Sequence, residues 1–565
     1  MGSGSKQPQT GANPGPGGPK AATHRQLGSV GRGPFWVASL AARYVSAHMA
    51  AETGMGVQAT PSAEAGTARA PAGGTSRVVV SPARSLGRLD RNVFGGFVEH
   101  LGRCINGGLF DPGSAFSDER GYRLDVLEAL RRLQVSVLRW PGGNFVSQYH
   151  WQDGVGPRAS RPARANLAWG GTEPNTFGTD EFLEYCGLLG AAPYICLNMG
   201  TGTLQEALDW VEYCNGTVGT YWAGQRAHNG HREPYAVTYW GLGNEMYGDW
   251  QVGQLSAEEY VATASRWARA LRRVSPGLKL VSCGLNGWSD WDRVVVDGLA
   301  GLVDLHSVHL YTGAPDYWTN VLSPYQAQRA ITCASAWLWR AAYERQAGTV
   351  PKIAYDEWNV WYRTDDGALE ERYSFADALA VATYLNIFVR NCRWVKMANL
   401  AQLVNAIAPV VATPEGCYLQ PTYYPFWLHS SSALEEACDA WVDGPQVSPP
   451  AEPAGRWQHR LGDLGPFPVV DAAATTDASR TRLSVTLVNR QAGESKVRLA
   501  LQGFAFTGDV SVKVLTAGSG PPAAAGPGIE AVQLDEATWP AKGPGTQGAL
   551  PPESFAVVQA SIAPG

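Results

Sequence analysis

The sequence lacks paired cysteines, long apolar runs and any concentration of basic residues. Its nine cysteines are odd in number, show no paired spacing, and stand mostly in apolar runs, which argues against a disulfide framework and against a zinc site. No run of about 18 apolar residues occurs, so we expect no membrane-spanning segment. The net charge is −5 over 565 residues and no basic stripe stands out, which disfavours nucleic acid as a partner.

A convincing signal peptide is also missing. The apolar patch at residues 35–42 is brief and lies far from Met1, whereas a secretory signal places its apolar segment close to the N-terminus. Scattered, unpaired cysteines are typical of a reducing compartment. Together these features predict a cytoplasmic protein.

The N-terminal residues 1–75 are rich in Gly, Pro, Ala, Ser and Thr and contain few large apolar residues. Such a segment buries too little surface to offset the entropy of ordering it, so we predict a disordered extension. Order is expected to begin at residues 76–90, where an apolar run predicts a strand that joins the C-terminal β-domain.

Residues 91–410 alternate between short apolar runs and longer amphipathic stretches. Eight strands alternating with helices predict a (β/α)8 TIM barrel. An open doubly wound sheet is the structural rival, but residues 94–97 lack the glycine spacing of its phosphate-binding loop. The predicted strands are 93–97, 135–140, 193–198, 236–241, 279–283, 305–310, 352–355 and 394–400, and the predicted helices are 124–133, 180–189, 205–213, 257–274, 292–299, 325–344 and 375–389.

The pattern of apolar and polar residues changes after residue 410. Long helical patterns stop, and runs of alternating apolar and polar residues appear between Gly- and Pro-containing turns. This pattern predicts that residues 411–565 form an antiparallel β-sandwich, jelly-roll-like in character. Within it, the Gly/Pro/Ala-rich stretch 516–550 is expected to be a long surface loop.

Polar residues follow the predicted barrel strands, at the end where TIM barrels carry their catalytic groups. They form a rim of carboxylates and amides with a few histidines and one arginine, without a dense His/Asp cluster or an activated Ser or Cys. The sequence therefore predicts neither a metal ion nor a cofactor. The residues are Glu99, Arg139, Asn144, Asn198, Asn244, Glu245, His306, His309, Tyr311, Asp356, Glu357, Gln402 and Asn405.

Two glutamates on this rim, Glu245 and Glu357, suit glycoside hydrolysis. One carboxyl must carry a proton for the leaving oxygen and the other must stay ionised, so their environments must separate their pKa values. Arg139 would keep one of them ionised, and we expect the pKa of Glu245 to be raised before the reaction. Asn144 and Asn244 offer amide donors and acceptors to sugar hydroxyls.

Five motifs, in order along the chain, resemble those of the α-L-arabinofuranosidases of glycoside hydrolase family 51. The resemblance runs from Val93 to about Trp427 and fades in the C-terminal domain, and residues 1–75 show none of it. The motifs are GFVEHLGR at 96–103, LRWPGGNF at 138–145, GNEM at 243–246, DEWNVWY at 356–362 and LAQLVN at 400–405.

The resemblance implies a role for each matching residue. Glu245 would be the general acid/base and Glu357 the nucleophile of a retaining, exo-acting enzyme that cleaves arabinose from arabinan, arabinoxylan or arabino-oligosaccharides. Arg139 would support the nucleophile and His309 the acid/base. The family also implies an intracellular homo-oligomer, often a hexamer, that needs no metal. The residues implied to contact the substrate are Glu99, Asn144, Trp169, Asn244, Tyr311 and Gln402.

Three other functions remain open from the sequence. Another retaining glycosidase on the same barrel, a xylosidase or an endoglucanase, would use the same pair of carboxylates. A non-catalytic carbohydrate-binding protein would bind sugar without turnover, although the two glutamates together with Arg139 speak against it. A metal-dependent barrel hydrolase is disfavoured because the histidines are dispersed.

Overall fold

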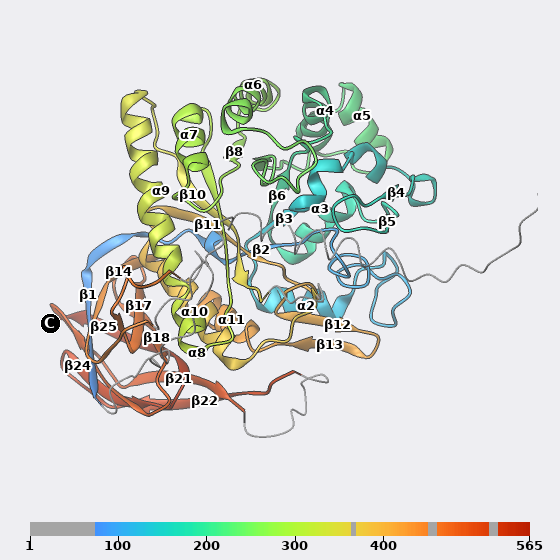
Figure 1. The fold of residues 1–565 in the computed structure, drawn as a ribbon. Coiled ribbons are helices and arrows are strands. Elements are labelled where there is room, and N and C mark those ends of the chain that lie inside the picture. Colours follow the sequence, from blue (N-terminus) through green and yellow to red (C-terminus); the bar gives the residue numbers. More distant parts are fainter. Residues whose placement is uncertain (1–73, 363–368, 450–459, 519–528) are drawn as a thin grey trace, which may run out of the picture.

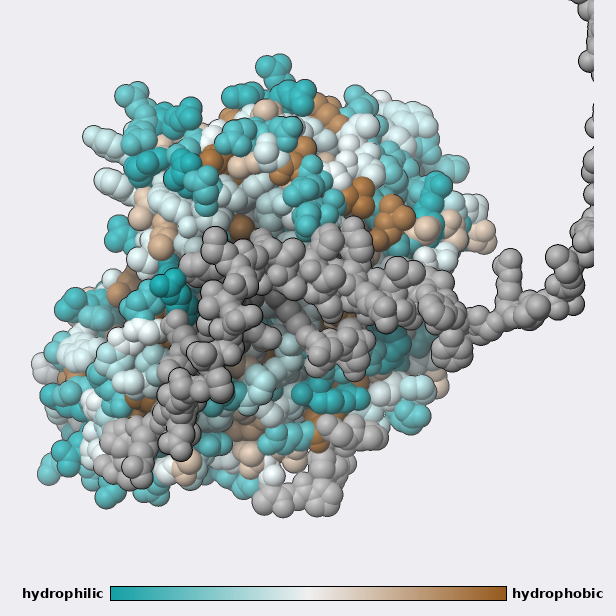
Figure 2. Space-filling model, viewed as in Figure 1, coloured by the Kyte–Doolittle hydropathy of each residue, from teal (hydrophilic) through white to brown (hydrophobic). Residues whose placement is uncertain are grey.

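The computed structural model describes residues 74–362, 369–449, 460–518 and 529–565, which form a barrel and a C-terminal sheet with separate cores (Figure 1). The predicted extension at 1–75 lies outside the described residues except for its last two. Among the described residues, no helix is long and apolar enough to cross a membrane. The face shown in Figure 2 is mostly hydrophilic, with hydrophobic residues scattered across it.

The barrel is closed and consists of eight parallel strands, which confirms the predicted (β/α)8 architecture. Each predicted strand overlaps an observed one, because short apolar runs between amphipathic helices are what a doubly covered parallel barrel requires. In barrel order the strands are β2 (Gly95–Phe97), β3 (Val137–Trp140), β6 (Ala192–Cys196), β7 (Tyr239–Leu242), β8 (Lys279–Ser282), β9 (Leu305–Thr312), β10 (Lys352–Val360) and β11 (Val395–Ala401).

The helices around the barrel follow the predicted amphipathic stretches. The helix α6 shows why, since Ser256 and Glu259 form a capping box at its start and it ends just before Pro276. The predicted helices correspond to α2 (Leu124–Arg132), α3 (Thr179–Leu189), α4 (Leu204–Asn215), α6 (Ala257–Val274), α7 (Asp290–Leu299), α9 (Tyr325–Glu344) and α10 (Phe375–Arg390).

Three helices were not predicted, namely α5 (Tyr221–His228), α8 (Tyr317–Leu322) and α11 (Tyr423–Ser432). The first two are short. The third is buried along most of its length, so it lacks the alternation of polar and apolar faces that signals a helix. Short 3-10 helices lie at Arg91–Phe94, Asn144–Gln148, Trp151–Gly154 and Arg158–Ser160.

The C-terminal domain is one eleven-stranded, mostly antiparallel sheet. The strand β1 (Thr75–Arg88) precedes the barrel in sequence but lies inside this sheet, antiparallel to β14 and parallel to β19 (Figure 1). Inward-facing side chains from both ends of the sheet share one core, and β22 contacts β24, so the sheet folds over that core. The other strands are β14 (Glu436–Asp443), β17 (Val470–Thr476), β18 (Arg482–Asn489), β19 (Ser495–Leu501), β20 (Phe504–Phe506), β21 (Val510–Ala517), β22 (Val532–Trp539), β23 (Ala541–Lys542), β24 (Gly545–Leu550) and β25 (Ser554–Pro564).

Two details differ from the sequence prediction. Residues 411–435 do not belong to the sheet. The hairpin of β12 (Val410–Thr413) and β13 (Gly416–Leu419) contacts α2. The helix α11 packs on α10, and its Phe426 also contacts Phe94 of the barrel. The stretch 516–550 is not one long loop, because it contains β22, β23 and β24. The strand β22 is exposed along most of its length, so its apolar residues do not form the buried face that marks a strand in a sequence. Two-stranded pairs complete the fold at β4 (Arg164–Ala165) with β5 (Thr172–Glu173) and at β15 (Gln446–Val447) with β16 (Phe467–Pro468).

Candidate active site

Most of the polar residues predicted to line one rim of the barrel meet at the carboxyl ends of its strands. Asn198, His306 and Asn405 do not, because they bond to residues outside this group. The chain reaches this rim from β2, β3, β7, β9, β10 and β11, which bring residues more than 300 positions apart into hydrogen-bond contact. Seven of these residues form one connected network of hydrogen bonds and ion pairs, and Glu99 forms a separate group with Trp169 and Gln402. The seven are Arg139, Asn244, Glu245, His309, Tyr311, Asp356 and Glu357.

The centre of the site is a pair of carboxylates, Glu245 after β7 and Glu357 near the end of β10. One oxygen of each lies within 4.8 Å of the other. The ring of His309 sits beside both, with Nδ1 3.0 Å from Glu245 Oε1 and 3.5 Å from Glu357 Oε2. Like charges this close raise the energy of the doubly ionised pair unless cations or hydrogen-bond donors offset it.

Glu357 is held by two donors. Arg139 Nη1 donates to Oε1 at 2.6 Å and the Tyr311 hydroxyl donates to Oε2 at 2.8 Å. Arg139 is almost fully buried, and although burial would lower its pKa, the charges of Asp356 and Glu357 raise it well above its ordinary value. The guanidinium therefore stays charged and holds Glu357 by a charge-assisted hydrogen bond.

Asp356 lies deeper than Glu357 and contacts the groups around it. It accepts hydrogen bonds from Tyr194 at 2.8 Å and Ser307 at 2.5 Å, and its oxygens lie 3.6 Å from Arg139 Nε and 3.4 Å from His309 Nε2. Burial raises its pKa, but Arg139 and His309 outweigh burial and hold the pKa below its usual range. A regular strand would turn two successive side chains to opposite faces, whereas the pairing of β10 is irregular here, so both carboxyls reach His309.

Each carboxylate oxygen of Glu245 has a hydrogen-bond partner, and the Tyr247 side chain bonds to the carboxylate as well. His309 Nδ1 contacts Oε1 at 3.0 Å and Trp250 Nε1 donates to Oε2 at 3.2 Å. Burial raises the pKa of Glu245, but the hydrogen bond and charge of His309 outweigh it and the pKa is lowered. The expectation of a raised pKa is therefore wrong for this state of the site. The chain reaches this position through left-handed backbone at Gly243 (φ 77°) and at Glu245 itself (φ 44°), a conformation that is costly for a glutamate.

The groups around His309 favour its protonated, positively charged form. Burial would lower its pKa, but Glu357, Asp356 and Glu245 raise the pKa to about 10. The ring then carries protons on both nitrogens and presents no lone pair to a metal ion. Glu245, His309 and Glu357 stand close enough to hold a metal, yet their hydrogen bonds to one another already account for the arrangement.

Glu99, at the end of β2, forms the opposite wall. Its Oε1 accepts from the Phe145 amide at 3.0 Å and from Trp169 Nε1 at 2.9 Å, and its Oε2 accepts from Gln402 at 3.0 Å. Burial raises its pKa to about 7 against the opposing effect of these bonds. Near neutral pH this carboxyl is divided between its two forms, so it can either accept a hydrogen bond from a sugar hydroxyl or donate one.

The groups close to Gly143 include a donor without a partner. A Cβ atom built on Gly143 would lie 3.2 Å from Glu357 Oε1 and 3.4 Å from both Asn244 Nδ2 and Glu99 Oε2. Asn244 Oδ1 accepts from Arg139, while its buried Nδ2 has no protein partner. A buried donor without a partner is costly, which makes Asn244 Nδ2 a candidate to bind a hydrogen-bonding ligand.

Two residues of the loop after β7 were missed by the sequence analysis. Trp250 contacts Glu245, and Gln251 Nε2 donates to Asn144 Oδ1 at 2.7 Å, which ties Asn144 to the site. The Trp250 ring lies against Gly248, where an added Cβ would come within 2.4 Å of it. No strand period covers this loop, so its side chains could not be placed from the sequence.

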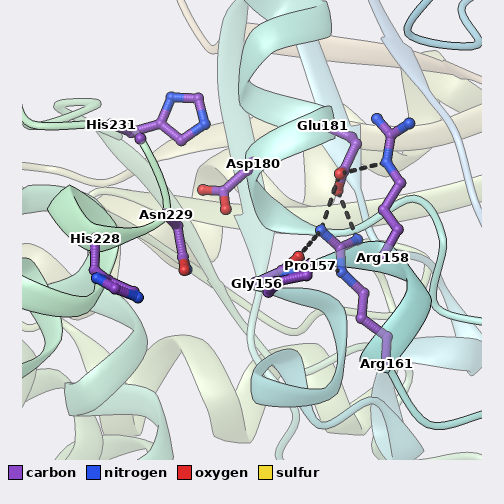
Figure 3. A pocket seen from close by; sticks show the side chains of 10 residues that line it. Gly156, Pro157, Arg158, Arg161, Asp180, Glu181, His228, Asn229 and His231 are labelled. Atoms are coloured by element: carbon purple, nitrogen blue, oxygen red, sulfur yellow. Dashed lines mark hydrogen bonds and ion pairs between the residues drawn. The ribbon is translucent and has the colours of Figure 1, made fainter.

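A pocket of about 460 Å³ is lined by residues outside this network. Figure 3 shows the side chains that line it. Glu181 binds both Arg158 and Arg161, and Asp180 accepts hydrogen bonds from Tyr213 and Tyr235. Since Glu181 and Asp180 already have these partners within the protein, they give no indication of a bound ligand.

Comparison with protein-family models matches two regions of the chain. Residues 129–330 match the model described as the α-L-arabinofuranosidase 1 domain, and residues 356–554 match the α-L-arabinofuranosidase C-terminal domain. The two regions cover most of the barrel and most of the C-terminal sheet.

Curated proteins and solved structures are similar over most of their length. A probable α-L-arabinofuranosidase C from Aspergillus niger is 43% identical over 486 residues, which is 82% of this chain and 94% of that protein. An intracellular exo-α-(1→5)-L-arabinofuranosidase from Halalkalibacterium halodurans is 34% identical, over 74% of this chain and 86% of that one. The crystal structure of the Thermotoga maritima α-L-arabinofuranosidase in complex with arabinose is 37% identical and superimposes with a TM-score of 0.76, covering 86% of this chain and all of that chain.

Proposed function

The chain belongs to the α-L-arabinofuranosidases of glycoside hydrolase family 51, and from that premise we propose that it removes terminal L-arabinose by a retaining, exo-acting double displacement. The observation that carries the proposal is the spacing of Glu245 and Glu357, whose nearest oxygens lie within 4.8 Å. Retaining glycosidases place their carboxyls about 5–5.5 Å apart, while inverting ones need about 6.5–9.5 Å to admit water between carboxyl and sugar.

In the first step Glu357 attacks the anomeric carbon. Arg139 and Tyr311 each donate to one of its oxygens and orient the carboxylate. Glu245 faces the same space and delivers a proton to the leaving oxygen as the glycosidic bond breaks.

In the second step Glu245 acts as a base. It deprotonates a water molecule, which attacks the anomeric carbon and releases arabinose from Glu357 with the original configuration. Glu357 thus serves as the nucleophile beside Arg139, and Glu245 serves first as the acid and then as the base.

The sugar itself is held by the groups around Gly143. Asn244 Nδ2 donates to one hydroxyl, and Glu99 binds others while Gln402 fixes its position. Asn144 and Tyr311 add further polar contacts. Trp169, whose indole nitrogen binds Glu99, covers the side from which the leaving group departs.

The substrate we propose is a terminal arabinofuranosyl unit of arabinan, arabinoxylan or an arabino-oligosaccharide. One relative is named an exo-α-(1→5)-L-arabinofuranosidase. By resemblance to the family, we also propose that the protein is a cytoplasmic homo-oligomer, and we expect a hexamer. A xylosidase or endoglucanase activity and a non-catalytic sugar-binding role are the alternatives to be separated by experiment.

A panel of aryl glycosides tests this function. We expect turnover of the 4-nitrophenyl α-L-arabinofuranoside to exceed that of the β-D-xylopyranoside and β-D-glucopyranoside by at least about 100-fold in kcat/KM, because a site shaped for one set of hydroxyls rejects others. Activity should be unchanged in excess chelator. Preference for the xyloside or glucoside would favour the rival glycosidases, and binding of arabinose without turnover would favour the non-catalytic role.

A further inference from the structure

The hydrogen bonds of Glu245 link it to His309. Trp250 Nε1 is only a donor, so Oε2 of Glu245 accepts a hydrogen bond from it. On the other side Oε1 lies 3.0 Å from His309 Nδ1, and either of these two atoms can hold the proton between them. Glu245 and His309 are therefore close enough to pass one proton between them.

The surroundings of His309 decide on which atom that proton rests. Its side chain is only 5% exposed, and carboxylates face it from two sides: Glu245 and Glu357 at Nδ1 and Asp356 at Nε2. Arg139, Tyr247, Trp250 and Cys283 are the other titratable or donor groups near the carboxylates that face the ring. Three carboxylates around one imidazole hold the proton on the ring and leave Glu245 ionised.

We propose that His309 is the proton store of the reaction: the proton that Glu245 gives to the leaving oxygen comes from His309 Nδ1, while Asp356 fixes the ring through Nε2. This inference rests on the proposed function and deepens it. It also explains how Glu245 can act as an acid although it stands in the site as a carboxylate. The raised pKa of His309 and the lowered pKa of Glu245 agree with it.

The step balances without a further reactant. A Glu357 oxygen forms a bond to the anomeric carbon, and the glycosidic bond breaks with its electron pair on the leaving oxygen. His309 Nδ1 passes its proton to the ionised Glu245, and Glu245 passes that proton on to the leaving oxygen, which leaves His309 neutral and protonated on Nε2. When water attacks, its proton passes through Glu245 back to Nδ1 and the electron pair of the ester bond returns to Glu357.

The timing follows from charge. The negative charge of Glu357 helps to hold the proton on His309, and this charge disappears as Glu357 becomes an ester. The ring then holds its proton less tightly at the moment when the leaving oxygen needs one. Nucleophilic attack and proton delivery are coupled through a single imidazole.

The variant His309→Asn tests the proposal, because an amide can still donate toward Glu245 Oε1 but cannot release a proton at these pH values. In the unchanged enzyme the alkaline limb of kcat/KM should lie well above pH 6.5, since the His309 pKa is raised to about 10 and the proton is present below that value. In His309→Asn the limb should move to lower pH by at least about one unit, toward the value of a carboxylic acid. If His309 only stabilised the charge of Glu245, its removal would raise the Glu245 pKa and move the limb to higher pH, which would overturn the proposal.

The dependence of kcat/KM on the leaving group gives a second measurement, which a merely structural role of His309 would not change. His309→Asn should lower kcat/KM by about 100-fold for an alkyl arabinofuranoside, whose leaving oxygen needs a proton, and by less than about 5-fold for a dinitrophenyl arabinofuranoside, which does not. Equal losses for both substrates would contradict the inference.

The matched control is Trp250→Phe, which removes a donor to Glu245 that carries no titrating proton. Its alkaline limb should stay in place or rise, and a downward shift as large as that of His309→Asn would also overturn the proposal. The variants Glu245→Ala and Glu357→Ala distinguish a failure of the proposed function from a failure of this inference. Full activity in either variant would end the proposed function itself, whereas loss in both with an upward shift in His309→Asn would end only the inference.

Discussion

The variant Glu357→Ala is expected to lose on the order of 10⁵-fold in kcat/KM toward an aryl α-L-arabinofuranoside, as removal of a catalytic nucleophile does elsewhere. That loss equals about 7 kcal/mol of transition-state stabilisation. The reason is that no covalent intermediate can form without the carboxylate that Arg139 and Tyr311 orient. Steady-state kinetics with purified protein measures the effect.

Two controls accompany Glu357→Ala. Glu357→Gln keeps the length of the side chain and an oxygen that can accept from Arg139, yet should be nearly as inactive, because an amide is a poor nucleophile. Thermal unfolding should show a folded protein, since Arg139 retains Asp356 as a buried partner. A Glu357→Ala variant that keeps more than a tenth of the activity would refute the assignment.

The variant Glu245→Ala is expected to lose about 10²–10⁴-fold for substrates whose leaving oxygen must be protonated and far less for a dinitrophenyl substrate. Azide should restore turnover, because a small anion can enter the space of the missing carboxylate and attack the glycosyl–enzyme without base catalysis. The product should be a glycosyl azide with the same anomeric configuration as the substrate, which NMR of the product identifies.

Trp250→Phe serves as the reference for Glu245→Ala, since it changes the same corner of the site and leaves the carboxyl in place. It should show neither the dependence on leaving group nor the rescue by azide. A glycosyl azide of inverted configuration from Glu245→Ala would mean that azide attacks the substrate directly, and would contradict the double displacement.

The barrel and the pair Glu245 and Glu357 could be predicted from the sequence because they depend on periodicity and on strand ends. All parallel barrel strands are buried on both faces, so each is a short apolar run, and the polar residue after it marks the rim. The (β/α)8 fold and the family were confirmed. The roles of the individual residues remain predictions, which the variants above test.

What could not be predicted depends on contacts between distant segments. The lowered pKa of Glu245 needs His309 and Trp250 within hydrogen-bond reach, and only the folded chain shows that both oxygens accept. The contact of Asp356 with His309 depends on an irregular pairing in β10, which a strict strand period would not give. The exposed strand β22 and the buried helix α11 carry too little amphipathic pattern to be recognised.

The central claim is that Glu357 becomes covalently bonded to arabinose, and trapping that bond tests it most directly. Glu245→Ala incubated with a dinitrophenyl α-L-arabinofuranoside should form the intermediate and hydrolyse it slowly, because the base for the second step is missing. Mass spectrometry of the intact protein and of its peptic peptides is the measurement. We predict one added pentosyl unit, located on Glu357. No added sugar, or a sugar attached to another residue such as Glu99, would contradict the account.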